Sequence, residues 1–172
     1  MDNTKQALVV VIALLLAALG CKSLHDVSAQ TALISTDKFL EVPFGHDESI
    51  ASFKQSLPRK TSIRKLARHN KHYPEKTDTI YQFRYRESEV FVYKSYFNRE
   101  ILMAGTVANS KVKLVNGITV GITRGQLYNS IAGIKPTESD TVKISNSDET
   151  RNFSFIFRKG KLKKVMFSSY LD

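Results

Sequence analysis

Hydrophobic and polar positions alternate with two different periods along the chain. In the first stretch, Ile50, Phe53 and Leu57 recur at the spacing of one helix face. Asp47 precedes them and is a suitable N-cap. The strand-like stretch that follows, Thr79–Arg86, alternates strictly. This pattern predicts a short helix followed by a strand.

Further strands are expected after this one, at Glu89–Ser95 and Glu100–Val107, and Lys111–Val115 would extend the same sheet. The same order then recurs. Leu127, Ile131 and Ile134 have helical spacing after Thr123, which with Gln126 fits a capping box. The later strands are predicted at 141–145, 153–157 and 162–169, with a hairpin turn at Lys159-Gly160.

These elements predict an α+β fold made of two tandem units. Each unit is a short helix, or helices, followed by a three- to four-stranded antiparallel sheet. The first unit covers residues 39–115 and the second 116–172. Neither half would bury much core alone, so we expect both to pack as one compact domain. A single meander whose halves match by chance is the alternative.

The N-terminal segment has a different pattern. Residues 7–19 contain no polar side chain, and Lys5 precedes them. About 13 residues are too few for a typical membrane-spanning helix but suit the apolar part of a secretory signal. Residues 1–20 are therefore predicted to be a signal peptide, and residues 21–38 a flexible tether.

Cys21 is the only cysteine of the chain and follows this segment directly. Ala18-Leu19-Gly20-Cys21 resembles a bacterial lipobox, with the leucine and the small residue in exchanged places. The resemblance implies a lipoprotein signal, cleavage before Cys21, and acylation of Cys21 on its sulfur and new amine. Two acyl chains hold a protein stably on a membrane. An ordinary signal peptide or an uncleaved anchor is the alternative. The implied location is the bacterial envelope, on the outer membrane facing the periplasm.

A second resemblance concerns the fold. The run from Val120 to Leu127, and Gly160-Lys161-Leu162 after a strand rich in phenylalanine, resemble envelope lipoproteins with the β-lactamase-inhibitor-protein-like fold. Outer-membrane assembly lipoproteins share that fold. The resemblance implies binding of proteins through sheet faces and loops. It implies no catalytic residues.

The net charge of the 172 residues is +10, which indicates an acidic partner or surface. Six Lys or Arg residues and no acid fall in the insert 58–74, which only the first unit has. Ile63 and Leu66 predict a short basic amphipathic helix there, begun by Thr61 or Ser62 and ended near Asn70. Such a helix would contact an envelope protein or an anionic membrane, or would simply be a solvated face. The candidate contact residues are Arg59, Lys60, Arg64, Lys65, Arg68, Lys71, Arg84 and Arg86.

Aromatic residues suggest a second contact. Tyr81, Tyr85 and Tyr93 are interface candidates, because tyrosine and arginine are enriched where proteins meet. One face of each strand must nevertheless be core, and alternation does not say which. The alternative function is recognition of an anionic small molecule or glycan at the membrane surface, with Arg84 and Arg86 beside Tyr85.

Other chemistry has little support in the sequence. Nucleotide-binding glycine loops, His-Glu-x-x-His and nucleophile elbows are absent, so no catalytic residue and no cofactor are assigned. His69 and His72 make an incomplete metal site, and no metal is expected. Export from the cytoplasm makes nucleic acid an unsuitable partner. We therefore expect a non-catalytic protein-binding or assembly module, and the sequence does not define its oligomeric state.

Overall fold

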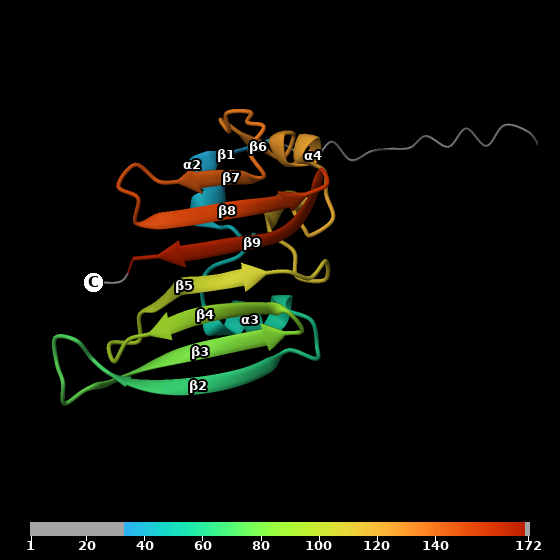
Figure 1. The fold of residues 1–172 in the computed structure, drawn as a ribbon. Coiled ribbons are helices and arrows are strands. Elements are labelled where there is room, and N and C mark those ends of the chain that lie inside the picture. The colour runs from blue at the N-terminus through green and yellow to red at the C-terminus, as the bar shows by residue number, and fades with distance from the viewer. Residues whose placement is uncertain (1–32, 171–172) are drawn as a thin grey trace, which may run out of the picture. The chain divides into compact units, whose positions relative to one another are not determined.

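The computed structural model describes residues 33–170, which all belong to one compact unit (Figure 1). Seven antiparallel strands form its main sheet in the order β2-β3-β4-β5-β9-β8-β7. Their bounds are β2 Ser62–His69, β3 Thr77–Tyr85, β4 Ser88–Lys94, β5 Glu100–Val107, β7 Thr141–Ser145, β8 Arg151–Arg158 and β9 Lys161–Ser169. A small parallel pair joins β1, Ile34–Ser35, to β6, Ile131–Ala132. The fold is thus α+β, as expected, and rich in strands.

The helices are short, and a serine or threonine side chain caps the start of each of the three α-helices. They are α2 Thr36–Glu41, α3 Ile50–Ser56, α4 Arg124–Tyr128 and the 3-10 turn η1 Val115–Gly117. Thr123 and Gln126 form the expected capping box of α4. Asp47, however, is not the cap of α3. The Ser49 side chain accepts the Ser52 amide at 3.1 Å, while Asp47 accepts the Ser49 amide and so shapes the preceding turn.

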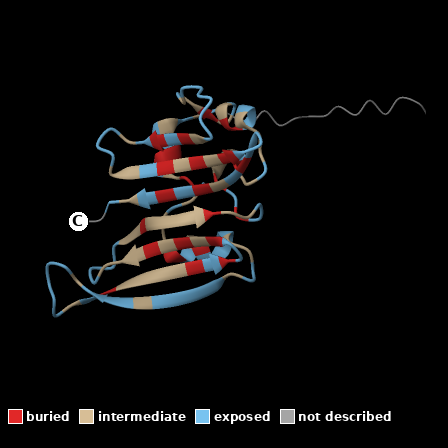
Figure 2. Cartoon of the chain, viewed as in Figure 1, coloured by how far each residue is buried: buried red, intermediate tan, exposed pale blue. Residues whose placement is uncertain are grey.

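Helices α2 and α3 lie on one side of the sheet, and the core fills the space between (Figure 1). Phe39 of α2 packs edge-on against Phe153 of β8, at 5.0 Å between ring centroids. Phe53 of α3 lies 5.8 Å from Phe83 of β3. Phe44, between the helices, contacts Phe53 and, on β9, Phe167. A continuous row of rings therefore links β8 and β9 to β3 in one core. Figure 2 shows buried positions on strands of both halves of the sheet.

Two meanders make up the main sheet. Strands β2 to β5 form one and β7 to β9 the other, and they meet where β5 pairs with β9. Most predicted strands are found within two residues of their expected ends. Lys111–Val115 is the exception, because it forms a turn and the start of η1 rather than a strand.

The basic insert is a strand and not the helix that its spacing predicts. Its residues 62–69 form β2, which pairs along its whole length with β3 and leaves seven of eight residues exposed. The insert holds too few apolar side chains to bury a helix face, whereas the free edge of β3 offers backbone partners to every second residue. Tertiary pairing therefore prevails over the apparent helical period.

The N-terminal part of the described chain also differs from expectation. Residues 34–38, placed in the tether by their polarity, form β1 and begin α2. Ile34 pairs with Ile131, and the Ser35 side chain caps α2 by accepting the Lys38 amide at 3.2 Å. The signal peptide 1–20 and Cys21 lie outside the described residues. Within residues 33–170, no helix has both the length and the apolar character needed to cross a membrane.

Candidate binding surface

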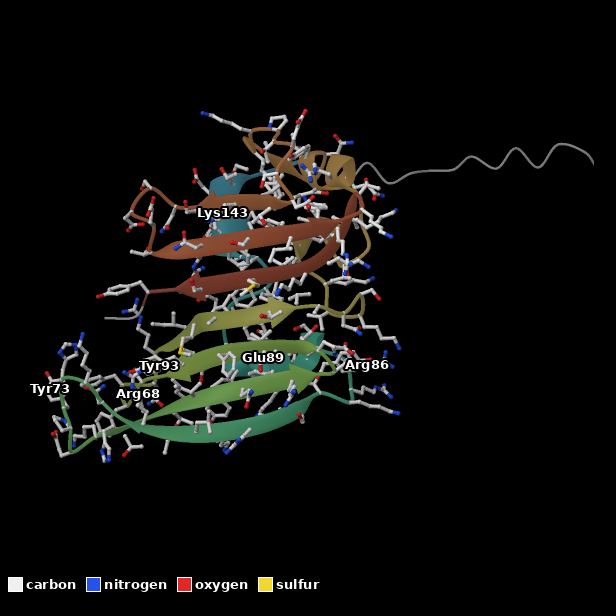
Figure 3. The ribbon with its side chains drawn as sticks, in the orientation of Figure 1. Arg68, Tyr73, Arg86, Glu89, Tyr93 and Lys143 are labelled. Carbon is white, nitrogen blue, oxygen red and sulfur yellow. The ribbon has the colours of Figure 1, made fainter. Side chains whose placement is uncertain are left out.

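The face of the sheet opposite α2 and α3 is not covered by any helix of the described chain, and we call it the open face (Figure 3). Paired residues of neighbouring strands lie on the same face, so the register defines which side chains it carries. One row crosses all seven strands as Arg64, Gln82, Phe91, Ala104, Ser168, Asn152 and Ser145. The next row is Ser62, Arg84, Glu89, Thr106, Met166, Ser154 and Lys143.

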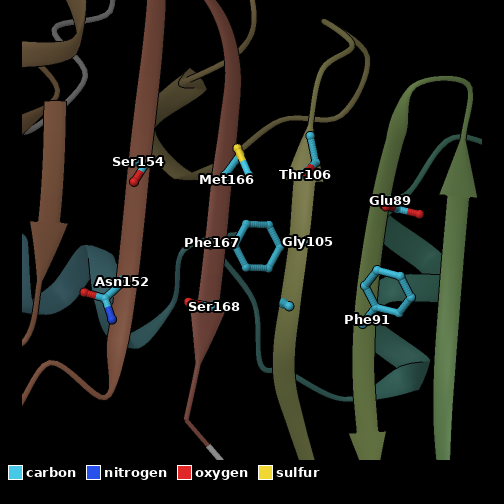
Figure 4. Close-up of a pocket in the computed structure, with 10 residues that line it drawn as sticks. Glu89, Phe91, Gly105, Thr106, Asn152, Ser154, Met166, Phe167 and Ser168 are labelled. Atoms are coloured by element: carbon cyan, nitrogen blue, oxygen red, sulfur yellow. The ribbon is translucent and has the colours of Figure 1, made fainter. Parts of the chain in front are cut away.

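Apolar side chains lie in the middle of this face and toward β2. Met166 on β9 is 43% exposed, and Phe91, on β4 across the intervening β5, is half-buried. A third row adds Leu66, Ile80, Tyr93 and Ile101. Between β4 and β8 the surface is hollowed by about 370 Å³, with Phe91, Met166 and small polar residues around the hollow (Figure 4). The hollow is open and shallow, which suits a protein side chain better than an enclosed ligand.

The floor of this hollow is made by Gly105 on β5. A Cβ atom added there would lie 2.4 Å from Cζ of Phe167 and 2.5 Å from the carbonyl oxygen of Glu89. Glycine thus lets the Phe167 ring lie against the backbone of β5, where it stacks on Phe153 in the core. The seam between the two meanders depends on this close approach.

The Phe153 and Phe167 ring centroids are 5.1 Å apart, and their planes are inclined by 15°. This stacked pair lies directly beneath the open face, on the core side of β8 and β9. The hollow is therefore backed by closely packed rings, which make it a rigid part of the surface.

Positive charge borders the apolar centre. Arg64, Arg84 and Lys143 are exposed on the open face, and in the described chain none of them forms an ion pair. Glu89, the acid in the same rows, accepts a hydrogen bond from the Gln82 amide at 3.1 Å. The ion pair between Glu48 and Arg151, at 2.6 Å, lies on the helix side. The open face is thus apolar at its centre and basic at its margins.

The structure divides the basic residues singled out in the sequence. The open face holds Arg64, Arg68 and Arg84. Lys65 points to the other side, where its Nζ lies 5.4 Å from the centroid of Tyr81. The turns and loops hold Arg59, Lys60, Lys71 and Arg86.

The three candidate tyrosines also lie on different faces of the sheet. Tyr85 is only 8% exposed and Tyr81 packs against the core, so both belong to the interior rather than to a contact surface. Arg86 lies 5.8 Å from the Tyr85 ring at the β3–β4 turn. Tyr93 alone lies on the open face, next to the buried carboxylate of Asp78.

Asp78 is 2% exposed and is held by three neighbours. The Asn70 amide donates to it at 2.9 Å, the Tyr96 backbone amide at 2.8 Å, and the Tyr93 hydroxyl also donates. Burial acts to raise the pKa of Asp78, but these hydrogen bonds prevail and lower it below its ordinary value. Burial, together with the bond to Asp78, raises the pKa of Tyr93 to about 12. Asp78 is therefore an ionised anchor for two loops.

Several residues of this surface were missed by the sequence reasoning, among them Met166, Ser154 and Asn152. The alternation of Phe153, Phe155 and Phe157 contained the signal, because residues between buried positions must face the other way. His69 and His72 lie at the end of β2 and in its loop, not on a shared helix face. Nowhere in residues 33–170 do three His, Cys, Asp or Glu side chains gather as a metal site would require.

Comparisons with models of protein families, with curated proteins and with solved structures find no match for this chain.

Proposed function

We propose that this domain is a non-catalytic protein-binding or assembly module that contacts its partner through the open face. The observation that carries the proposal is a seven-stranded sheet face that no helix of residues 33–170 covers, with Phe91 and Met166 at its centre. Sheet faces in soluble domains usually pack against another layer or are polar, and contiguous apolar side chains on them mark contact sites.

The size of the face suits this role. Six spacings of about 4.8 Å between strands and eight-residue strands at about 3.3 Å per residue give an area of roughly 750 Å². A standard protein interface buries about 800 Å² on each partner. One partner that covers the open face would therefore form an interface of ordinary size.

The charges specify the partner further. Arg64, Arg84 and Lys143 would lose water on contact, and in the described chain none of the three forms an ion pair that would compensate this loss. An acidic protein surface would supply that compensation and would speed association. We therefore propose an acidic partner protein with an apolar contact at its centre.

The proposal includes the location drawn from the sequence. A lipidated Cys21 would anchor the chain to the bacterial envelope, on the outer membrane facing the periplasm, and the partner would then be an envelope protein. The two meanders, which meet at their last strands, are consistent with descent from a duplicated unit of the β-lactamase-inhibitor-protein-like kind. Both statements remain proposals.

The test compares two substitutions that change the charge equally. Met166→Glu places a carboxylate in the centre of the open face, and Gln55→Glu places one on the exposed side of α3. Tagged full-length chains are expressed in the cells of origin, and the proteins that purify with them are quantified. We expect Met166→Glu to lose the partner at least about tenfold, as for a central contact residue, and Gln55→Glu to retain it. Retention by both variants would refute the open face as the binding surface.

A second function, recognition of an anionic small molecule or glycan, is supported by one other feature. Arg158, Lys159, Lys161 and Lys163 line a hollow of about 400 Å³ at the β8–β9 hairpin. Calorimetry of the full-length chain with inorganic pyrophosphate tests it. Binding that Lys161→Gln with Lys163→Gln abolishes, but Lys111→Gln with Lys113→Gln does not, would support this function. Absence of binding would exclude pyrophosphate-like ligands.

A further inference from the structure

Three exposed aromatic rings gather on two loops at one end of the sheet, and we call them the aromatic tip. They are Tyr73 in the β2–β3 loop and Tyr96 and Phe97 in the β4–β5 turn, exposed by 50%, 48% and 67%. Tyr73 and Tyr96 each pack edge-on against Phe97, with centroids 5.8 and 5.5 Å apart. The β2–β3 loop protrudes beyond the neighbouring turns (Figure 1), and Tyr73 is labelled at its end (Figure 3).

The two loops are fixed in place rather than simply adjacent. Asn70 accepts the amides of His72 and Tyr73 at 2.9 Å each, and its own amide donates to Asp78. Asp78 also accepts the Tyr96 amide, so one buried carboxylate ties both loops. The rings are thus held outward by bonds beneath them, and their exposure is built into the fold.

Cations surround the rings. Lys76 lies 4.6 Å from the centroid of Tyr96, and Lys71 and Arg99 are exposed on the same two loops. None of these three forms an ion pair in the described chain, although the exposed Glu75 lies in the same loop. Arg68, at the end of β2, pairs in register with Asp78.

We infer that the aromatic tip is a contact for an anionic phospholipid surface, with the three rings at the level of the headgroups and Lys71, Lys76 and Arg99 against lipid phosphates. Tyrosine and phenylalanine beside basic residues suit the boundary between headgroups and acyl chains. A protruding tip of this kind suits a soft bilayer surface, because such a surface accepts a convex shape. This inference goes beyond the proposed function, because the rings lie on loops and not among the paired residues of the open face.

The chain contains no tryptophan, so one introduced tryptophan is an unambiguous reporter. Phe97→Trp places it in the tip, and Lys135→Trp places a control in the exposed loop before β7. Each full-length variant is reconstituted in vesicles of phosphatidylcholine alone or mixed with phosphatidylglycerol in equal parts. Emission wavelength and quenching by brominated acyl chains are measured. Because the readout is local, insertion of the apolar N-terminal segment does not produce it.

We expect emission at position 97 to shift to shorter wavelength and to be quenched only in vesicles with phosphatidylglycerol, and the control to stay unquenched. Exchange of Lys71, Lys76 and Arg99 for glutamine should lower the equilibrium constant of contact on the order of a hundredfold, since each cation near such a surface contributes about fivefold. The same exchange at Lys111, Lys113 and Lys135, in the Phe97→Trp chain, should change little. Absence of quenching at position 97, or equal quenching without phosphatidylglycerol, overturns the inference. A protein adduct from a photo-crosslinker at position 97 without lipid quenching would also overturn it and assign the tip to a protein.

Discussion

The contact of Phe167 with Gly105 predicts that even one methyl group added at position 105 will lower the free energy of unfolding. In Gly105→Ala, the new Cβ would lie 2.4 Å from Cζ of Phe167 and 2.5 Å from the backbone oxygen of Glu89. The Phe167 ring is confined by Phe153 and Phe44, and the Glu89 oxygen belongs to the backbone of β4. Neither neighbour can retreat without moving a strand or the core.

The magnitude follows from these contacts. Overpacking of a core typically costs about 1–3 kcal/mol, and a clash that includes backbone belongs at the upper end. We therefore expect Gly105→Ala to lower the free energy of unfolding by about 3 kcal/mol. For a domain of this size the thermal midpoint should fall by about 10 °C.

Thermal and urea unfolding, followed by circular dichroism, measure the effect. Gly125→Ala is the matched control, because the nearest atom to its Cβ is 4.0 Å away and alanine favours the helix by up to about 1 kcal/mol. Phe167→Leu removes one of the two clashes, so the double variant should be less destabilised than the sum of the single variants. A Gly105→Ala chain as stable as the wild type would refute the described seam between β5 and β9.

Three further predictions follow from the described contacts and from the sequence. Asp78→Asn should cost about 1–3 kcal/mol in urea unfolding, because an amide cannot accept all the hydrogen bonds that Asp78 receives. Because the pKa of Asp78 is lowered in the folded chain, its contribution to the free energy of unfolding is present above the ordinary carboxyl pKa and is lost as the pH falls through the folded value. The free energy of unfolding of Asp78→Asn should therefore fall less steeply with decreasing pH than that of the wild type. An equally steep fall in both chains would contradict this. Folding raises the pKa of Tyr93 from 10.0 to about 12, so between these pH values the unfolded chain loses the tyrosine proton more readily than the folded chain. The wild type should therefore lose stability over this pH range, and Tyr93→Phe should lose less. Thermal unfolding at alkaline pH measures the difference. Metabolic labelling with a fatty-acid probe should mark the wild type but not Cys21→Ser, and an unlabelled wild type would refute the anchor.

Much of the fold could be predicted from local patterns, because strict alternation and turn chemistry are local properties. The structure contains the predicted alternation of Phe153, Phe155 and Phe157, and it also contains the Lys159-Gly160 turn and the Thr123 capping box. The basic insert could not be predicted in this way. Its helical spacing is real, but whether it pairs with β3 depends on an edge that only the folded sheet provides.

The binding surface was harder to predict for a similar reason. Alternation separates Tyr81 and Tyr85 from their neighbours but does not say which side the helices cover. Only the packing of α3 on Phe83 decides it, and it assigns both tyrosines to the covered side. The aromatic tip joins Tyr73 to Phe97 across two loops, and no local pattern connects them.

Photo-crosslinking in cells tests the central claim most directly. A photoreactive phenylalanine replaces Phe91 on the open face in one full-length chain and Gln55 on α3 in another. The account predicts that position 91 forms an adduct with an acidic protein and that position 55 does not. A protein adduct from position 55 alone, or none from position 91, would contradict it.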